Sequence, residues 1–467
     1  MQTQISKTEP LLWLVAIGFF MQSLDATILN TALPSMAASL GQSPLHMQSV
    51  VVAYALTTAL LIPATGWVAD RFGTRRIYAA AMSVFVLGSV LCALAPTVPF
   101  LVAARVVQGI GGAMMLPVGR LAVLRAYPRD AFIRAMSFIA IPGQIGPLLG
   151  PALGGWLVEY ASWHWIFWIN VPVGVIGIWA ALRWMPRNDQ QPLRRFDAGG
   201  FALLAFGMVG TSLALDGLSG MGMGHGLVAM LLVFGMASLA AYWMHALRSA
   251  NPLFPPVLFK VRSLRVGLLG NLFARLGSGA APFLVPLMLQ VGLGLSPLHA
   301  GSMMLATVLG SMIVKRFAVR TVVRFGYKHV LQVNSVLLGV MIAGLGLVSP
   351  DQPIVLIMMQ LFIFGGVNSM QFSAMNSVTL KDMNGTFASS GNSLLSMVQM
   401  LSMSMGVAVA GAVLSSYAEM WQGQENYRLL ALQATFFTVG FITLAATLVF
   451  SQLERDERVR AAPDSHD

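Results

Sequence analysis

Three ionisable residues, Asp25, Arg105 and Arg275, lie inside long apolar stretches of this sequence. A charge buried in such a stretch is costly and marks a functional site by default. Desolvation favours the protonated form of a carboxyl group, whereas a nearby guanidinium favours the ionised form. We therefore interpret Asp25 as a carboxyl group that binds and releases a proton, tuned by Arg105. The two residues lie at similar depths below the outer ends of their spans, so we expect them to meet across a cavity. The alternative is a static ion pair that holds two helices together.

Several polar residues in other apolar stretches are candidates for the wall of a substrate cavity. Gln108 shares a helical face with Arg105, since the two are three positions apart. Arg275 is expected to face the cavity from the second half of the chain, the alternative being that it extends to the membrane interface. Interhelical hydrogen bonding is the alternative for the polar residues. The remaining candidates are Gln22, Asn368, Gln371, Asn392 and Gln399.

The composition is that of a membrane protein. Of 467 residues, 57% are hydrophobic and only 10% are charged, whereas a soluble domain is about a quarter charged. A membrane-spanning helix needs about 20 apolar residues. That length predicts about fourteen spans, at residues 12–33, 49–69, 77–97, 100–122, 134–158, 164–185, 198–216, 226–246, 264–290, 298–319, 329–348, 353–375, 392–416 and 431–451.

The basic residues divide unequally between the two sets of loops. The net charge is +11, yet the loops on one side contain a single basic residue, Arg428. This asymmetry predicts that the other loops and both termini are cytoplasmic. We expect a multi-pass protein of the bacterial inner membrane, in contact with lipid and not with nucleic acid. Cys92 is the one cysteine, so no disulfide within the chain and no cysteine-based metal site is possible.

An internal repeat relates the two halves. Residues 40–46 read LGQSPLH and residues 293–299 read LGLSPLH, while Arg71-Phe72-Gly73 recurs as Arg324-Phe325-Gly326. The separation is 253 positions in both cases, and the same shift relates Gln22 to Arg275. We expect an all-α protein with two six-helix bundles at 1–190 and 251–455, an inserted helix pair at 191–250 and a tail at 456–467. Duplicated halves around a central site are typical of transporters.

Further motifs concern conformational change. The segment GWVADRFGTRR contains Gly66, Asp70, Arg71, Gly73 and Arg75 at the end of the second span. In the fifth span, glycines recur every four residues, so another helix can pack closely against them, and we expect that helix to come from the second half. The residues of this stripe and its bends are Gly146, Pro147, Gly150, Pro151 and Gly154.

These segments resemble motifs of the major facilitator superfamily. LDATILNTALP at 24–34 and WHWIFWINVPVG at 163–174 are similar to its fourteen-span drug:proton antiporter branch. The resemblance implies a major facilitator fold, a monomer, and proton-coupled export of amphipathic compounds, with the second-span and fifth-span motifs acting in gating. Val323 stands where the repeat would place the equivalent of Asp70, so gating by an acid is expected on one side only.

Two alternatives to drug export stay open. The first is export of an anionic metabolite or metal chelate, because the charged residues inside the apolar stretches are one acid, Asp25, and two arginines, Arg105 and Arg275. The second is a membrane receptor that does not transport, with a pore-forming channel as a weaker possibility. No phosphate-binding motif and no hydrolase motif is present in the sequence, so we expect neither an enzyme nor a cofactor.

Overall fold

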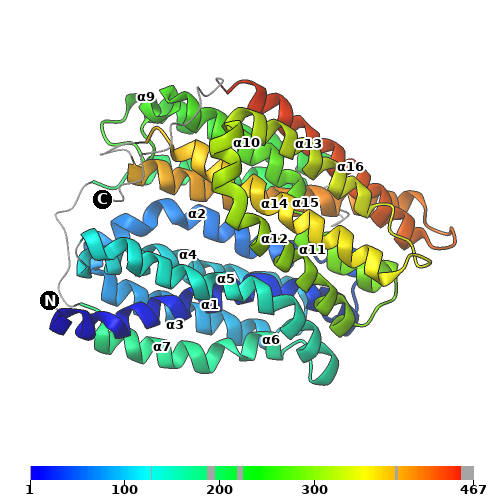
Figure 1. The fold of residues 1–467 in the computed structure, drawn as a ribbon, viewed down its shortest axis with the longest axis horizontal. Helices are drawn as coiled ribbons and strands as arrows, with labels where there is room; N and C mark the ends of the chain where they lie inside the picture. The colour runs from blue at the N-terminus through cyan, green and yellow to red at the C-terminus, as the bar shows by residue number, and fades with distance from the viewer. Residues whose placement is uncertain (1, 128, 187–194, 218–223, 384–387, 454–467) are drawn as a thin grey trace.

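The computed structural model describes residues 2–127, 129–186, 195–217, 224–383 and 388–453, and every regular element in these ranges is helical. The first half forms one bundle, blue to cyan in Figure 1. Its elements are α1 (Gln2–Ser39), η1 (Pro44–His46), α2 (Gln48–Phe72), α3 (Thr74–Ala93), α4 (Val98–Ala126), α5 (Arg129–Tyr160), α6 (Trp165–Trp168) and α7 (Asn170–Trp184).

An inserted pair follows, formed by α8 (Ala198–Gly217) and α9 (His225–Arg248), which pack against each other. The second bundle, green to red in Figure 1, begins with a short 3₁₀ turn. Its elements are η2 (Pro256–Lys260), α10 (Arg262–Ser278), α11 (Ala281–Leu287), η3 (Met288–Gly292), α12 (Pro297–Phe325), α13 (Tyr327–Leu345), α14 (Ile354–Leu380), α15 (Ala388–Met420) and α16 (Tyr427–Ser451).

All fourteen predicted spans coincide with a helix or with consecutive helices. Within the described residues, 13 helical segments are long and apolar enough to cross a membrane, and α5 coincides with the predicted span at 134–158. Two spans are less regular than expected. The sixth is divided into α6 and α7. The ninth is divided into α10, α11 and the π-helical η3, because Pro282 and Pro286 lack the N–H donors that a continuous helix needs.

The two copies of the sequence repeat adopt the same backbone conformation. Gly41 and Gly294 have φ angles of 65° and 70°, and Gly73 and Gly326 have φ angles of 84° and 76°. Only glycine adopts positive φ at no steric cost, which explains why both copies have glycine at both positions. The duplication thus extends to local geometry, while the domain boundaries at 190, 250 and 455 stay predictions.

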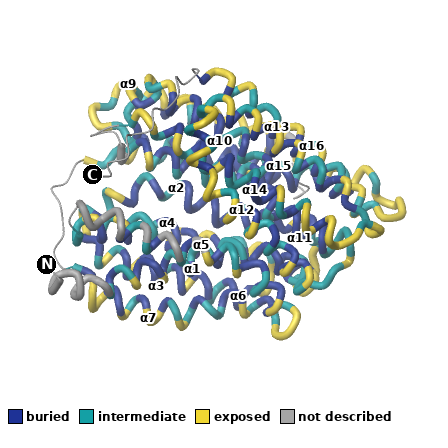
Figure 2. Tube along the Cα trace, in the orientation of Figure 1, coloured by how far each residue is buried: buried dark blue, intermediate teal, exposed yellow. Residues whose placement is uncertain are grey.

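The halves meet along two helix pairs, α2 with α15 and α5 with α12. Helix α8 packs against both α2 and α15, so the inserted pair lies over one of these seams. Buried residues, dark blue in Figure 2, extend through the region where the bundles meet. One apolar cluster there contains Ile28 and Ala32 of α1, Leu284 and Leu287 of α11, and Ala408 of α15.

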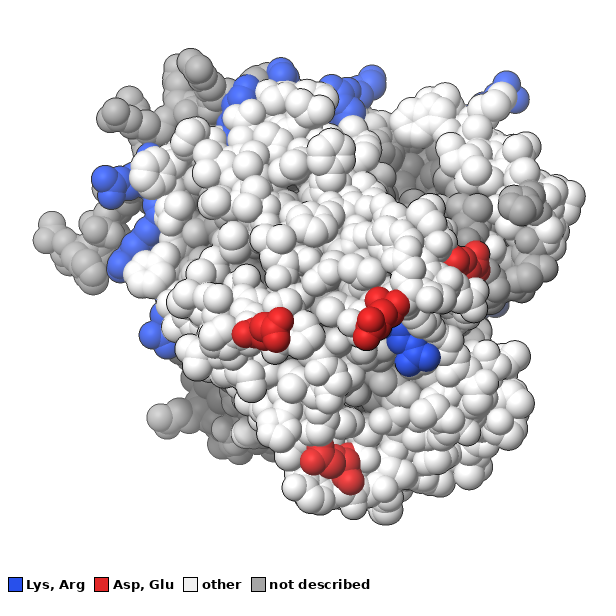
Figure 3. Space-filling view, turned by 90° about the vertical axis from the view of Figure 1, so that its right-hand side faces the viewer, with Lys and Arg blue, Asp and Glu red and all other residues white. Residues whose placement is uncertain are grey.

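The two ends of the helices differ in charge. We call the end that carries Arg71, Arg75, Arg125 and Arg324 the basic end. At the opposite end, which faces the viewer in Figure 3, acidic side chains predominate. Exposed charged residues in its loops and helix ends are Glu159, Asp351, Glu419, Glu425 and Arg428.

The glycine stripe of α5 faces its own bundle. A Cβ atom added at Gly146 would lie 2.8 Å from the Leu24 nitrogen, and one added at Gly150 would lie 2.2 Å from Thr27 Oγ1. At Gly154 it would lie 2.6 Å from the Ile28 oxygen. The expectation that a helix of the second half packs on this stripe is therefore wrong. Periodicity identified a close-packed face but not the helix that covers it, which is α1.

The second half meets α5 on an adjacent face. A Cβ atom at Gly155 would lie 2.3 Å from the Pro297 oxygen, and one at Gly301 would lie 2.1 Å from the Pro151 oxygen. Pro147 and Pro151 both lie inside α5, and Pro151 is thus the member of the predicted set that contacts α12.

We expect Gly150→Leu to destabilise the first bundle itself. Overpacking typically lowers the free energy of unfolding by about 1–3 kcal/mol, and the new side chain would collide with Thr27. The measurement is the melting temperature of the purified protein in detergent. Gly66→Leu is the matched control, because no atom lies within 4 Å of its added Cβ. An unchanged melting temperature in Gly150→Leu would show that α1 can move away from the stripe.

Candidate functional site

Asp25 is the centre of a buried polar network inside the first bundle. Arg105 Nη1 donates to Asp25 Oδ2 at 2.7 Å, and Gln108 Nε2 donates to Asp25 Oδ1 at 2.8 Å. Asn170 Nδ2 also donates to Oδ1, at 3.0 Å. Ser89 Oγ accepts from Gln108 at 2.9 Å. Both carboxylate oxygens are therefore bonded, as a buried charge requires.

The helices that carry this network approach closely because of glycine. Arg105 and Gln108 lie one turn apart on α4, and Arg105 Nη1 also donates to Gln108 Oε1 at 2.5 Å. A Cβ atom at Gly88 would lie 2.5 Å from the Gln108 backbone, so glycine at this position lets α3 bring Ser89 within reach. Asn170 begins α7 and completes the set.

The network is enclosed rather than open to a cavity. The Asp25 and Arg105 side chains are each 1% exposed. Tyr54 of α2 covers the guanidinium, whose Cζ lies 4.3 Å from the ring centroid. Glycine at position 112 makes room for this tyrosine, since an added Cβ atom would lie 2.5 Å from the Tyr54 hydroxyl. The predicted contact between Asp25 and Arg105 exists, but it does not cross a cavity as we expected.

A cavity of about 2070 Å³ lies between the two bundles and reaches the basic end. Of the predicted cavity residues, Gln22, Asn392 and Gln399 line it, as do Gly66 and Asp70 of the second-span motif. Gln399 Nε2 donates to Asn376 Oδ1, another lining residue, at 2.5 Å. Polar residues on α1, α14 and α15 thus converge on one space.

The opposite end is closed by contacts between the bundles. Gln290 Nε2 donates to the Thr31 oxygen at 2.9 Å, and the Leu298 nitrogen donates to Glu159 Oε2 at 3.1 Å. The close approaches at Gly155 and Gly301 lie in the same region. The structure is therefore open at the basic end and closed at the other.

Three predicted cavity residues on inward helix faces lie elsewhere. Gln108 belongs to the Asp25 network, and Asn368 is outside the cavity lining. Gln371 is fully buried and bonds to Ser335 and Asn334, each at 2.8 Å. Helical spacing placed these residues on inward faces, but an inward face of a bundle meets other helices before it meets the cavity.

Arg275 is separated from the cavity by Phe372. Its Cζ lies 4.5 Å from the Phe372 ring centroid, and Phe372 lines the cavity. Nε donates to Asn271 Oδ1 at 3.3 Å, while Nη2 is buried with no hydrogen-bond partner. Arg275 thus does not extend to the interface, and it reaches the cavity wall only through the aromatic ring.

The second-span motif forms a cluster at the basic end. Asp70 makes an ion pair with Arg125 of α4, a partner that sequence reasoning missed. Arg71 lies over the Trp67 ring, with Cζ 5.4 Å from its centroid. Arg75 donates to the Leu182 oxygen of α7. Gly73 supplies the turn between α2 and α3, with its φ of 84°.

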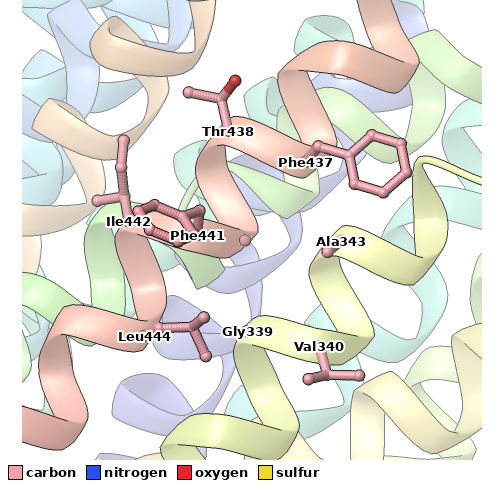
Figure 4. Close-up of a pocket in the computed structure, with 9 residues that line it drawn as sticks. Gly339, Val340, Ala343, Phe437, Thr438, Phe441, Ile442 and Leu444 are labelled. Atoms are coloured by element: carbon pink, nitrogen blue, oxygen red, sulfur yellow. The ribbon is translucent and has the colours of Figure 1, made fainter.

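A smaller groove of about 500 Å³ lies between α13 and α16 (Figure 4). Gly339 and Gly440 allow close packing there, since a Cβ atom on either would lie within 3 Å of backbone atoms of the other helix. Phe441 and Val340, which line it, are exposed. The lining contains no titratable side chain, so this groove offers no chemistry for coupling.

Comparison with known proteins supports this architecture. The profile of the Major Facilitator Superfamily matches residues 15–407. A protein of Serratia proteamaculans named "Putative multidrug resistance protein MdtD" is 55% identical over 407 residues, covering 87% of this chain and 85% of the relative. Its namesake in Pectobacterium atrosepticum is 50% identical over 455 residues, 97% of each chain.

Two solved structures show the same fold at low sequence identity. A D-xylose-proton symporter superposes with a TM-score of 0.68 at 15% identity, covering 95% of this chain and 97% of its own. A transporter of the POT family, in complex with a thioalcohol-conjugated peptide, gives a TM-score of 0.69 at 15% identity and 94% coverage of both chains. The expected all-α fold with two bundles is confirmed.

We expect Arg105→Ala to lower the free energy of unfolding by about 3–5 kcal/mol, because it leaves the buried Asp25 carboxylate without its cation. The double variant Arg105→Ala, Asp25→Asn removes that lone charge and should lose less. Melting temperatures in detergent test this, with Arg428→Ala as an exposed control. A loss in the double variant equal to the sum of the losses in Arg105→Ala and Asp25→Asn alone would contradict an energetic coupling between the two residues.

Proposed function

Because the chain belongs to the Major Facilitator Superfamily, we propose that it is a proton-coupled exporter of small, amphipathic, drug-like molecules. One observation carries the proposal. A carboxylate, Asp25, lies in an enclosed network that a tyrosine separates from a large cavity open at one end. The name shared by its relatives, multidrug resistance protein, supports the substrate class.

Transport would proceed by alternating access. Basic loops are retained in the cytoplasm, so we assign the basic end to the cytoplasm and the protein to the bacterial inner membrane, with both termini inside. The form described here is then open inward. In the other form, the seams between α2 and α15 and between α5 and α12 would separate at the opposite end. A monomer suffices, because both bundles come from one chain.

The proton route would lead from the cavity to Asp25 through Tyr54. Gln22 and Thr58 line the cavity, and the Tyr54 hydroxyl lies beside both. Rotation of the Tyr54 ring would admit water to Arg105 and then to Asp25. A proton taken up by Asp25 neutralises the carboxylate and frees Arg105, so α1 and α4 are no longer held together by charge. Release of the proton restores the ion pair.

Asp70 has a proposed role in closing the cytoplasmic gate. It lines the cavity opposite the first turns of α15, where Ser390 and Asn392 also line it. The N-terminus of a helix carries partial positive charge, so approach of α15 to Asp70 would be favourable. In the open form, Arg125 occupies the carboxylate instead. Gating by this acid is one-sided, because Val323 lies at the equivalent position of α12.

Export of anionic compounds is the second candidate, favoured by the charges that line the cavity. Arg120, Arg195 and Lys315 line it, while the two lining carboxylates, Asp70 and Asp197, already contact Arg125 and His245. Uptake of ethidium, a lipophilic cation, and of fluorescein, an anion, each added outside inverted vesicles, distinguishes the candidates. Binding without transport of either probe would favour the receptor alternative.

We expect Asp25→Asn to abolish proton-driven uptake of ethidium into inverted vesicles, because asparagine keeps the shape of the side chain but cannot titrate. Exchange of labelled for unlabelled substrate without a pH gradient should persist, since exchange does not require the proton site to cycle. Asp351→Asn, in an exposed loop, is the control and should transport normally. Full proton-driven uptake in Asp25→Asn would remove Asp25 from the coupling mechanism.

We expect Asp70→Asn to lower the turnover rate with normal insertion in the membrane. Loss of the charge removes the attraction to α15 that would stabilise the inward-closed form, so the open form accumulates. Initial rates of uptake, normalised to the amount of protein, measure the effect. Asp382→Asn, an exposed acid after α14, is the control. A wild-type rate in Asp70→Asn would contradict a role in gating.

A further inference from the structure

The carboxylate of Asp197 joins three segments at the basic end. Asp197 Oδ1 accepts from the Gly200 nitrogen at 2.9 Å, which is the geometry of a helix N-cap at the start of α8. The same oxygen lies 2.7 Å from His245 Nε2 in the last turn of α9. Oδ2 accepts from the Leu253 nitrogen at 3.3 Å. One buried side chain thus holds both inserted helices and the segment that follows them.

That following segment, residues 250–255, forms part of the wall of the central cavity. A second contact fixes it, because the Tyr242 hydroxyl of α9 accepts from the Phe254 nitrogen at 3.1 Å. Phe254 and Leu258 are buried in an apolar cluster with Leu56 of α2 and Leu395 of α15. The segment is therefore anchored to the inserted pair and to both bundles.

Aromatic and apolar groups accompany it in the cavity wall. Phe196 precedes Asp197, and its ring centroid lies 4.9 Å from that of Trp67. Both residues line the cavity, as do Asn251 with its exposed amide and the apolar Leu253. A planar aromatic compound that carries one polar group matches this surface, because the rings offer stacking and the amide offers a hydrogen bond.

We propose that the inserted helix pair supplies a third wall of the substrate site, formed by Phe196 and residues 250–255, with Asp197 as the positioning residue. The ligand class is an aromatic, amphipathic compound. The inference rests on the proposed transport function and adds that selectivity depends on residues outside the two bundles. It gives the inserted pair, which the fold itself does not require, a part in substrate recognition.

The sequence offers a direct test of this site by cysteine labelling. Cys92, the one native cysteine, is fully buried, so Asn251→Cys can be labelled on a silent background. Inverted vesicles expose the basic end to a membrane-impermeant maleimide. Lys260→Cys is the control, since Lys260 is in the same connection but outside the cavity lining.

Ethidium at ten times its Kd should slow labelling of Asn251→Cys about tenfold, in proportion to the unoccupied fraction, and leave Lys260→Cys unchanged. Equal effects on the two variants, or no protection by ethidium in vesicles that export it, would overturn the proposal. The assay reads binding without a pH gradient. Protection at Asn251→Cys in a protein that shows no proton-driven export would therefore count against the proposed function alone.

Substitution of Asp197 tests its positioning role. Asp197→Asn retains an oxygen for the helix cap and loses the charge beside His245, whereas Asp197→Ala loses both. We expect Asp197→Ala to raise KM for ethidium about tenfold, the loss expected from one or two hydrogen bonds of about 1 kcal/mol each, with a smaller rise in Asp197→Asn. The ratio of ethidium to fluorescein transport should also change. A uniform fall in maximal rate with unchanged KM and unchanged ratio would indicate a structural role only and overturn the assignment.

Discussion

A single ion pair between Asp25 and Arg105, sealed inside one bundle, constrains the rest of this structure. Neither charge can be stable in a low-dielectric interior without the other, and both need hydrogen-bond partners for their remaining atoms. The first bundle supplies those partners from α3, α4 and α7, and it supplies the Val50 carbonyl of α2 to Arg105 Nε at 3.4 Å. Glycines at positions 88, 109 and 112 allow the helices to come close enough.

The second bundle also contains a buried polar network between its helices, but this network is uncharged. Asn334, Ser335 and Gln371 form a neutral network between α13 and α14, so no proton is needed to balance it. Arg275 of α10 lies behind Phe372 at the cavity wall. The halves arise from a duplicated sequence, yet the titratable carboxyl group lies in the first and an uncompensated guanidinium in the second. This division separates the proposed proton site from the cavity in which a substrate binds.

Much of this arrangement could be predicted from the sequence, and the remainder had physical reasons to be missed. Apolar length and basic loops gave the number of spans, and the depth of Asp25 and Arg105 gave their contact. Ser89 and Asn170 were missed because small polar residues in apolar helices carry no period of their own, although Asn170 lies within the motif at 163–174. The pattern predicts that Gln371 faces the cavity and that a helix of the second half covers the glycine stripe, whereas Gln371 bonds to α13 and α1 covers the stripe. A helical face in the sequence does not specify which helix covers it.

Asp216 shows the same limit. Its position at the end of α8 predicts an interfacial residue, yet it is 4% exposed and lies beside Gln48 at the start of α2. Helix α8 packs against α2 and α15, two helices remote in sequence. Contacts between segments distant in the chain depend on the topology of the fold and not on the local sequence pattern. The packing of α8 on α2 and the contacts of Asp197 with His245 and Leu253 are two examples.

The contacts that close the opposite end are well suited to opening. The two bundles meet there mainly through apolar surfaces and close backbone approaches. Two hydrogen bonds join them as well, one donated by Gln290 and one accepted by Glu159. Each such bond contributes only about 0.5–1.5 kcal/mol net, and water can replace it. By contrast, the charged network that would be costly to break lies wholly within one bundle and moves with it. In the proposed rocking of the bundles, only such weak contacts would have to separate at this end, so a proton at Asp25 and a ligand in the cavity would together determine which end is open.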